Sequence, residues 1–184
     1  AKVRDIAPQA ERIVQISPKP RDSEIIVEPV KEEEKWDEAL LPGIQAIQAI
    51  DAGFSMRDFL EGSKTAFEMV LAAFGKNDRE TLTLLLSKEL LAQFGQDIDV
   101  RAEQEEHPET TLISILSATP AEVGEAGGKG HVTVRFESEQ IQSRRDKSGK
   151  IVAGSTGDIH TVLDIWTFER DLRAANPNWT IVAT

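Results

Sequence analysis

The feature that most constrains the fold is a change of hydrophobic period near Pro108. Before this proline, apolar residues recur at the spacing of one helix face, as Phe59, Phe67 and Phe74 do. After it, apolar and polar residues alternate from residue 132 to residue 137, which is the period of a half-buried strand. Helices followed by strands predict an α+β domain, in which N-terminal helices pack on a curled antiparallel sheet of four or five strands.

Four helices are predicted from this spacing and from the residues that flank it. Ser55 and Ser87 are of the type that caps a helix N-terminus, and Asn77 or Asp78 is expected to cap a short helix. Gly75 is expected to be the C-cap of the longest helix. The predicted helices span residues 44–51, 56–74 and 79–86, with a fourth that begins at residue 87 and fades into the charged run 101–107.

The second half of the chain contains the signals of an antiparallel meander. Predicted strands span residues 110–118, 131–143 and 151–153, and a long one begins at residue 158. Residues 124–130 are rich in glycine and are interpreted as a flexible connector. Asn176, Pro177 and Asn178 are turn formers, so Trp179 is expected to return as an antiparallel neighbour of the long strand.

The long strand carries apolar side chains on both faces. Because successive side chains alternate, Leu163 and Ile165 point one way, while Val162, Trp166 and Phe168 point the other. This pattern predicts a strand inside the sheet. Strands twist with a fixed hand, so the sheet should curl, and helices on its concave face should leave a tapering apolar cavity, as in the cone of NTF2-like and cystatin-like folds.

The first 35 residues differ from the rest of the chain in composition. They contain four prolines and the acidic run 32–34, and they lack aromatic residues. Such a segment buries too little apolar surface to offset its ordering entropy, so residues 1–35 are predicted to be a disordered, flexible polar linker and residues 36–184 the folded domain. The apolar islands 13–16 and 25–27 are interpreted as chance features of this tail, with docking motifs as the alternative.

Composition excludes several classes of protein. A formal net charge of −11 argues against a nucleic-acid partner, since phosphate binding requires clustered Lys and Arg. The chain has no cysteine, which excludes disulfides and zinc-thiolate sites. No apolar run approaches the roughly 18–20 residues that span a bilayer, and charges interrupt any signal-peptide pattern at the start. No catalytic residue, metal site or cofactor is predicted.

Several blocks along the last three quarters of the chain resemble one family. In them the chain is similar to the Tim44-like domain, and more closely to the bacterial Tim44/TimA family of adaptor proteins of alphaproteobacteria. The resemblance covers residues 44–184, and its Trp-Thr-Phe and Pro-Asn-Trp blocks are the most specific. The blocks comprise Phe59, Gly62, Phe67, Ala73, Asp78, Leu82, Leu85, Val132–Phe136, Asp164–Arg170 and Pro177–Trp179.

The resemblance implies an α+β lipid-binding domain with a large apolar pocket, working at the inner membrane. Mitochondrial relatives are peripheral scaffolds that couple the import motor's chaperone to the translocation channel and bind cardiolipin. The implied partners are a membrane lipid, with cardiolipin as candidate, and a translocase or chaperone component. The implied location is the bacterial inner membrane, peripheral or tethered through an N-terminal segment absent from this sequence. The matrix side of the mitochondrial inner membrane is the alternative.

Two sets of apolar residues are candidate binding sites. The residues of the first set either line a ligand or lipid pocket or form an ordinary core. The residues of the second set lie before the sheet and are candidates for membrane contact, with a solvated linker junction as the alternative. The pocket candidates are Phe67, Leu71, Phe74, Leu91, Phe94, Val134, Phe136, Leu163, Ile165, Trp166 and Phe168. The membrane candidates are Trp36, Leu40, Leu41, Ile44 and Ile47.

Asp164 is the one titratable residue with a sharper alternative. Alternation places it on the same face as Trp166 and Phe168, where an apolar pocket would raise its pKa and suit it to act as a base. The plainer interpretation is that it pairs with Arg135 or Arg170. The sequence therefore predicts a non-enzymatic membrane-associated adaptor, related to protein translocation or inner-membrane protein assembly. The alternatives are a small NTF2-like enzyme acting on an apolar substrate, and a purely structural interaction module.

Overall fold

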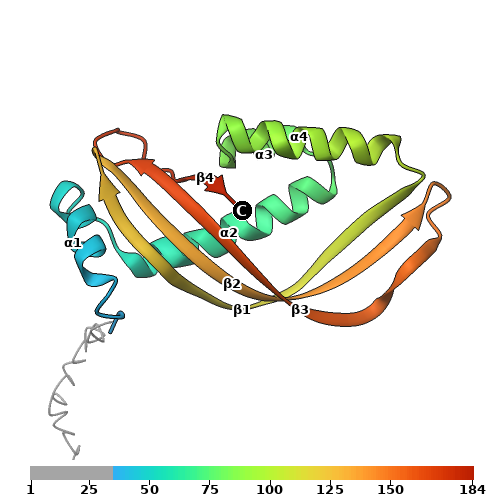
Figure 1. Cartoon of the computed structure of the whole chain (residues 1–184), viewed down its shortest axis with the longest axis horizontal. Coiled ribbons are helices and arrows are strands. Elements are labelled where there is room, and N and C mark those ends of the chain that lie inside the picture. The colour runs from blue at the N-terminus through green and yellow to red at the C-terminus, as the bar shows by residue number, and fades with distance from the viewer. Residues whose placement is uncertain (1–34) are drawn as a thin grey trace, which may run out of the picture. The chain divides into compact units, whose positions relative to one another are not determined.

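The computed structural model describes residues 35–184, which form four helices and one four-stranded antiparallel sheet (Figure 1). The α+β class predicted from the change of period is confirmed, with helices on one side of a curled sheet. The predicted linker and its apolar islands lie outside the described residues, apart from Lys35.

The helices begin where the predicted caps stand. Ser55, Asp78 and Ser87 each accept a hydrogen bond from the backbone amide three residues further on, as N-caps do. Pro42 lies in the first turn of the first helix, where no helical bond is lost, so this helix begins three residues earlier than predicted. The helices are α1 (Leu41–Ile50), α2 (Met56–Gly75), α3 (Arg79–Leu85) and α4 (Lys88–Glu103).

The C-terminus of α2 corrects one prediction. Gly75 is the last helical residue rather than the cap, and the left-handed residue that follows is Asn77, with φ 57°. The Asp78 amide donates to the Ala73 carbonyl at 2.8 Å, and the Asn77 amide donates to the Phe74 carbonyl at 3.3 Å. These two hydrogen bonds together form a Schellman motif, which turns the chain directly into α3.

The sheet has four strands in the order β1-β2-β3-β4, each antiparallel to its neighbour. Residues 151–153 and the stretch from 158, predicted as separate strands, belong to one strand whose pairing is interrupted between Gly154 and Ile159. The strands are β1 (Glu106–Ala126), β2 (Lys129–Asp146), β3 (Ile151–Asp171) and β4 (Thr180–Ala183). As predicted, the segment after Trp179 returns beside the long strand.

The glycine-rich stretch is a tight hairpin rather than a flexible connector. β1 and β2 continue through most of it, and only Gly127 and Gly128 form the turn, with φ 62° and 88°. Two successive positive φ values define the turn type whose twist matches that of the flanking strands, and glycine reaches them without strain.

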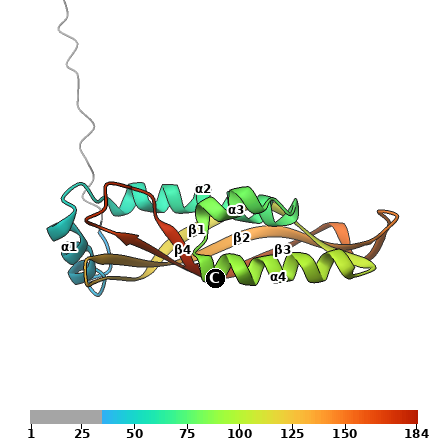
Figure 2. The same ribbon diagram turned by 90° about the horizontal axis from the view of Figure 1, so that it is seen from above.

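The helices cover one face of the sheet. Figures 1 and 2 show α2, α3 and α4 on its concave side. On this side Phe67 of α2 packs on β2 and β3. The Phe67 ring centroid lies 4.5 Å from that of Phe136 and 4.7 Å from that of Trp166. Leu163 and Ile165 point to the other face and are 50% and 54% exposed. The apolar character of both faces of β3 therefore does not mean that both are buried.

Candidate functional site

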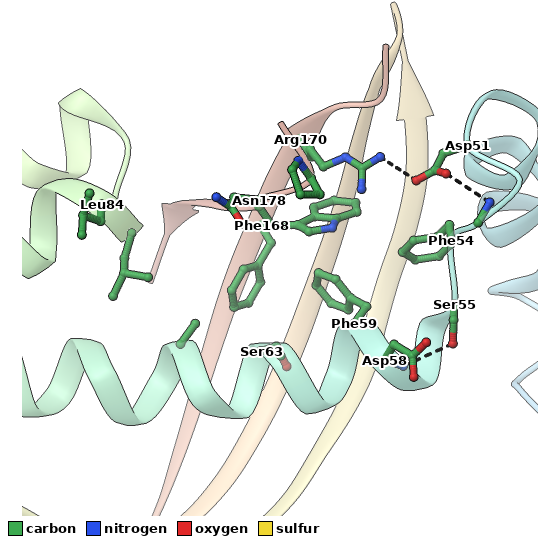
Figure 3. Close-up of a pocket in the computed structure, with 16 residues that line it drawn as sticks. Asp51, Phe54, Ser55, Asp58, Phe59, Ser63, Leu84, Phe168, Arg170 and Asn178 are labelled. Atoms are coloured by element: carbon green, nitrogen blue, oxygen red, sulfur yellow. Dashed lines mark hydrogen bonds and ion pairs between the residues drawn. The ribbon is translucent and has the colours of Figure 1, made fainter. Parts of the chain in front are cut away.

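A cavity of about 560 Å³ lies between the N-terminal half of α2 and the closing segment of the chain (Figure 3). Its walls come from the α1–α2 loop, α2, the end of α3, the end of β3 and the segment before β4. The lining residues are Asp51, Gly53, Phe54, Ser55, Asp58, Phe59, Gly62, Ser63, Ala66, Leu84, Leu85, Phe168, Arg170, Pro177, Asn178 and Trp179.

Aromatic rings form the apolar part of this cavity. The Phe59 ring centroid is 4.8 Å from that of Trp179 and 5.4 Å from that of Phe168, in edge-to-face arrangements. The Phe54 ring centroid lies 5.8 Å from that of Trp179. Such edge-to-face pairs stabilise one another beyond their burial, so the wall is held in place without a ligand.

Small residues of α2 leave the space that these rings surround. Gly62, Ser63 and Ala66 succeed one another along the helix face that borders the cavity. A Cβ at Gly62 would meet nothing within 4 Å. The Ser63 hydroxyl donates to the Leu60 carbonyl at 2.8 Å, so its polar group is satisfied within the helix. At these three positions the helix face therefore presents little bulk and no unpaired polar side chain.

One ion pair forms the polar end of the cavity. Arg170 donates from Nη2 to Asp51 Oδ2 at 2.5 Å, and the Arg170 side chain is only 12% exposed. The Arg170 Cζ atom lies 5.6 Å from the centroid of the Trp179 ring. The Arg170 Nε is buried and has no hydrogen-bond partner among the described residues. Because the other Asp51 carboxylate oxygen accepts from the Gly53 amide, this pair also fixes the α1–α2 loop (Figure 3).

The structure divides the predicted pocket residues into four groups. Of the eleven, Phe168 lines this cavity, while Phe67, Val134, Phe136 and Trp166 belong to the buried core. Leu71, Phe74, Leu91 and Phe94 are partly buried against that core. Leu163 and Ile165 lie on the uncovered face of the sheet, so their placement in a pocket is wrong.

About half of the lining residues that the sequence did not predict come from loops. Phe54 and Asp51 lie between two helices, where no periodic pattern marks them. Arg170 and Trp179 are the last residues of the two blocks that are most specific for the family resemblance. Their place in these blocks is the one sequence feature that could have marked them as site residues. Arg170 pairs with Asp51 and not with Asp164.

The membrane candidates are mostly buried in the domain itself. Leu40, Ile44 and Ile47 belong to the hydrophobic core, with exposures of 8% or less, so their side chains do not face a bilayer. Their helical spacing reflects packing against the sheet, because α1 contacts β1. Trp36 is partly buried against the core, and Leu41 is exposed.

Asp164 lies on the concave face but outside the cavity. Its neighbour Gln140 is buried and donates from Nε2 to the buried Ser138 hydroxyl at 3.0 Å. Burial raises the pKa of Asp164, and a hydrogen bond with Gln140 opposes this shift. Asp164 is therefore not among the described residues that line the cavity, where a base would have to lie. The raised pKa of Asp164 reflects its partial burial beside Gln140.

Replacing Asp164 with asparagine should change how stability depends on pH. A carboxyl whose pKa is raised on folding stabilises the fold while it is protonated, and this contribution is lost as the pH rises through the raised pKa. We expect Asp164→Asn to gain stability relative to the parent as the pH rises from about 4 to about 7. Urea unfolding across this range tests it, with the exposed Asp158→Asn as control. A stability difference that does not change with pH would contradict the expectation.

The fold and the cavity define a class: an α+β domain with an apolar cavity between its helices and a curled antiparallel sheet. The Tim44-like domain family matches residues 42–184, and the chain belongs to this family. The family predicted from the sequence is thereby confirmed, while the narrower bacterial assignment stays a prediction.

A curated relative and two solved structures are similar to this chain. The mitochondrial import inner membrane translocase subunit TIM44-1 of Arabidopsis thaliana is 26% identical over 127 residues, which are 67% of this chain and 26% of the relative. The chain thus spans about a quarter of that relative's length. The intermembrane space region of the chloroplast protein ARC6 is 16% identical, with a TM-score of 0.44 over 70% of this chain and 93% of that one. A conserved protein from Planctomyces limnophilus DSM 3776 is 17% identical, with a TM-score of 0.32 over 66% and 92%.

None of the helices in residues 35–184 combines the length and the apolar character that crossing a membrane requires.

Proposed function

We propose that this domain is a non-enzymatic, membrane-associated adaptor that holds an acyl chain or an apolar peptide segment in its cavity. The observation that carries the proposal is an open cavity of about 560 Å³, walled by Phe54, Phe59, Phe168 and Trp179. This volume is typical of sites for small molecules, which are about 300–1,000 Å³, mostly apolar and largely preformed. Aromatic walls and small residues on α2 suit an extended apolar ligand rather than a polar one.

The polar end of the cavity gives such a ligand a direction. Arg170 places a positive charge beside the aromatic wall, and Asp51 neutralises it only from the loop side. A ligand with an apolar chain and an acceptor head group would place that head near Arg170, because an arginine binds carboxylate and phosphate oxygens well. Lipids and fatty acids have this chemistry, and cardiolipin is the lipid that the family resemblance favours.

The partners and the location follow from the family. A relative of this chain is an inner-membrane translocase subunit, so we assign the domain to protein translocation or inner-membrane protein assembly. Its protein partner would then be a translocase or chaperone component. Its location would be the inner membrane of a bacterium, or the matrix side of the mitochondrial one. With Leu40, Ile44 and Ile47 buried, the bound lipid and exposed residues such as Leu41 provide the contact with the membrane.

The proposal is tested by native mass spectrometry of the chain purified in the presence of membranes. We expect a co-purified lipid in the parent and its loss in Gly62→Leu, whose added side chain enters the open space beside the cavity. Leucine also favours the helix by about 0.8 kcal/mol over glycine, so loss of lipid in this variant would not come from unfolding. Gly75→Leu, at the exposed end of the same helix, is the control and should keep the lipid. Lipid retained by Gly62→Leu, or absent from the parent, would contradict the proposal.

The enzyme alternative makes a different prediction for Asp164. This residue does not line the cavity, so Asp164→Asn should bind lipid as the parent does. Loss of turnover of a steroid-like or other apolar substrate in Asp164→Asn would overturn the non-enzymatic assignment.

A further inference from the structure

The face of the sheet that the helices leave uncovered carries a compact group of apolar and charged side chains. Leu163 and Ile165 of β3 are exposed, and Leu116 of β1 is 52% exposed. Between these two strands, β2 presents Arg135 and Glu137. We call these five residues the outer patch.

The register of the strands fixes the arrangement of the outer patch. Arg135 of β2 stands opposite Ile165 of β3, and Glu137 stands opposite Leu163. On the other side of β2, Leu116 lies at a register shift beside the partner of Glu137. Each charged residue thus shares a row with one apolar residue, and the two rows are neighbours on one face.

The two charges of the outer patch are available to a partner. None of the ion pairs within residues 35–184 involves Arg135 or Glu137. Arg135 is exposed and Glu137 is half-buried, and these two opposite charges lie two residues apart on one strand. Turning a second copy of the strand end to end therefore brings each charge opposite one of the other sign.

We propose that the outer patch is the interface of a symmetric dimer of this chain. A two-fold axis that crosses the strands between the two rows places each Arg135 opposite the partner subunit's Glu137. The same rotation places each Ile165 opposite the partner subunit's Leu163. Each two-fold interface of this kind uses one self-complementary patch, and sheets packed face to face keep their strands nearly aligned.

Charge favours a second copy of this chain over an unrelated partner. One rotation satisfies both charges and both apolar residues, and a partner of another sequence would have to reproduce this arrangement by coincidence. The net charge of −11 opposes unspecific association of two copies, so the reciprocal ion pairs must select this face. The patch is small and lies on the face of the sheet away from the helices, which is the convex face in Figure 1. The dimer therefore belongs to the weak class that buries less than about 1,200 Å².

Sedimentation velocity of the full chain tests the dimer in about 0.15 M salt, where long-range repulsion is screened. We expect a monomer–dimer equilibrium with a dissociation constant in the micromolar range, on the order of 10–100 μM. Arg135→Glu and Glu137→Arg should each weaken the dimer about tenfold or more, because each places like charges opposite one another. Lys150→Glu changes net charge as much as Arg135→Glu does but lies in the β2–β3 turn, so it should leave association unchanged.

Two further samples separate a symmetric interface from other effects of charge. An equimolar mixture of Arg135→Glu and Glu137→Arg should form a heterodimer about as tight as the parent dimer, because each subunit now carries two like charges that meet two opposite ones. The double variant should also regain self-association. A parent that stays monomeric, single variants that dimerise normally, or a mixture that does not associate would each overturn the proposal. Circular dichroism confirms that the variants are folded.

The inference does not depend on the proposed function, because the outer patch and the cavity lie on opposite faces of the sheet. Gly62→Leu should therefore dimerise like the parent while losing its lipid. Failure of one proposal leaves the other unaffected.

Discussion

Replacing Phe67 with alanine is expected to lower the free energy of unfolding by about 3–5 kcal/mol, the range of large-to-small changes in a closed core. The Phe67 side chain is fully buried and stacks on Phe136, and the Trp166 ring lies tilted beside it. Its removal opens a cavity between α2 and the sheet at the point where both layers meet. Denaturant unfolding followed by circular dichroism measures the loss.

Met69→Ala is the matched control for this prediction. It lies on the same helix two residues further on and is 40% exposed, so its replacement should change the free energy of unfolding by less than about 0.5 kcal/mol. A loss of less than about 1 kcal/mol for Phe67→Ala would contradict the packing of α2 against β2 and β3.

The second large effect is expected at Gly43. A Cβ at this position would lie 1.9 Å from the carbonyl oxygen of Val123, which belongs to the backbone of β1 and cannot turn aside. Gly43→Ala should therefore destabilise the domain by about 1–3 kcal/mol or release α1 from the sheet. Hydrogen exchange distinguishes the two results, because release of α1 exposes its amides without global unfolding.

Gly62→Ala gives the opposite sign from the same substitution. A Cβ at Gly62 meets nothing within 4 Å, and glycine inside a helix costs about 0.5–1 kcal/mol relative to alanine. We expect Gly62→Ala to stabilise the domain by about that amount. Equal effects at positions 43 and 62 would contradict the close approach of α1 to β1.

The sequence predicted the elements in which local signals and packing agree. α2 was placed almost to the residue because its cap, Ser55, and its stripe of phenylalanines indicate the same face. β1 was predicted as nine residues but spans 21, because register shifts near Ile113 and Leu116 interrupt the alternation that marks a strand. Pro108 and Pro120 also obscure it, although an edge strand tolerates both.

The candidate site could be predicted only in part, for a geometric reason. Alternation shows that Leu163 and Trp166 lie on opposite faces of β3, but it does not show which face the helices cover. The aromatic wall combines a loop residue, Phe54, with Phe59 of α2 and Trp179 near the C-terminus, and only the fold brings these segments together. The buried positions of Ile44 and Ile47 show the same limit, since an apolar helical stripe suits a protein core as well as a membrane.

The claim that the cavity takes an acyl chain is tested most directly by fluorescence of Trp179, whose indole lines it. Bromine on an acyl chain quenches a tryptophan that it touches, so the full chain is titrated with a brominated fatty acid. We predict saturable quenching in the parent and in Gly75→Leu, and little or none in Gly62→Leu and in Trp179→Phe. Quenching that does not saturate, or that is as strong in Gly62→Leu as in the parent, would contradict the claim.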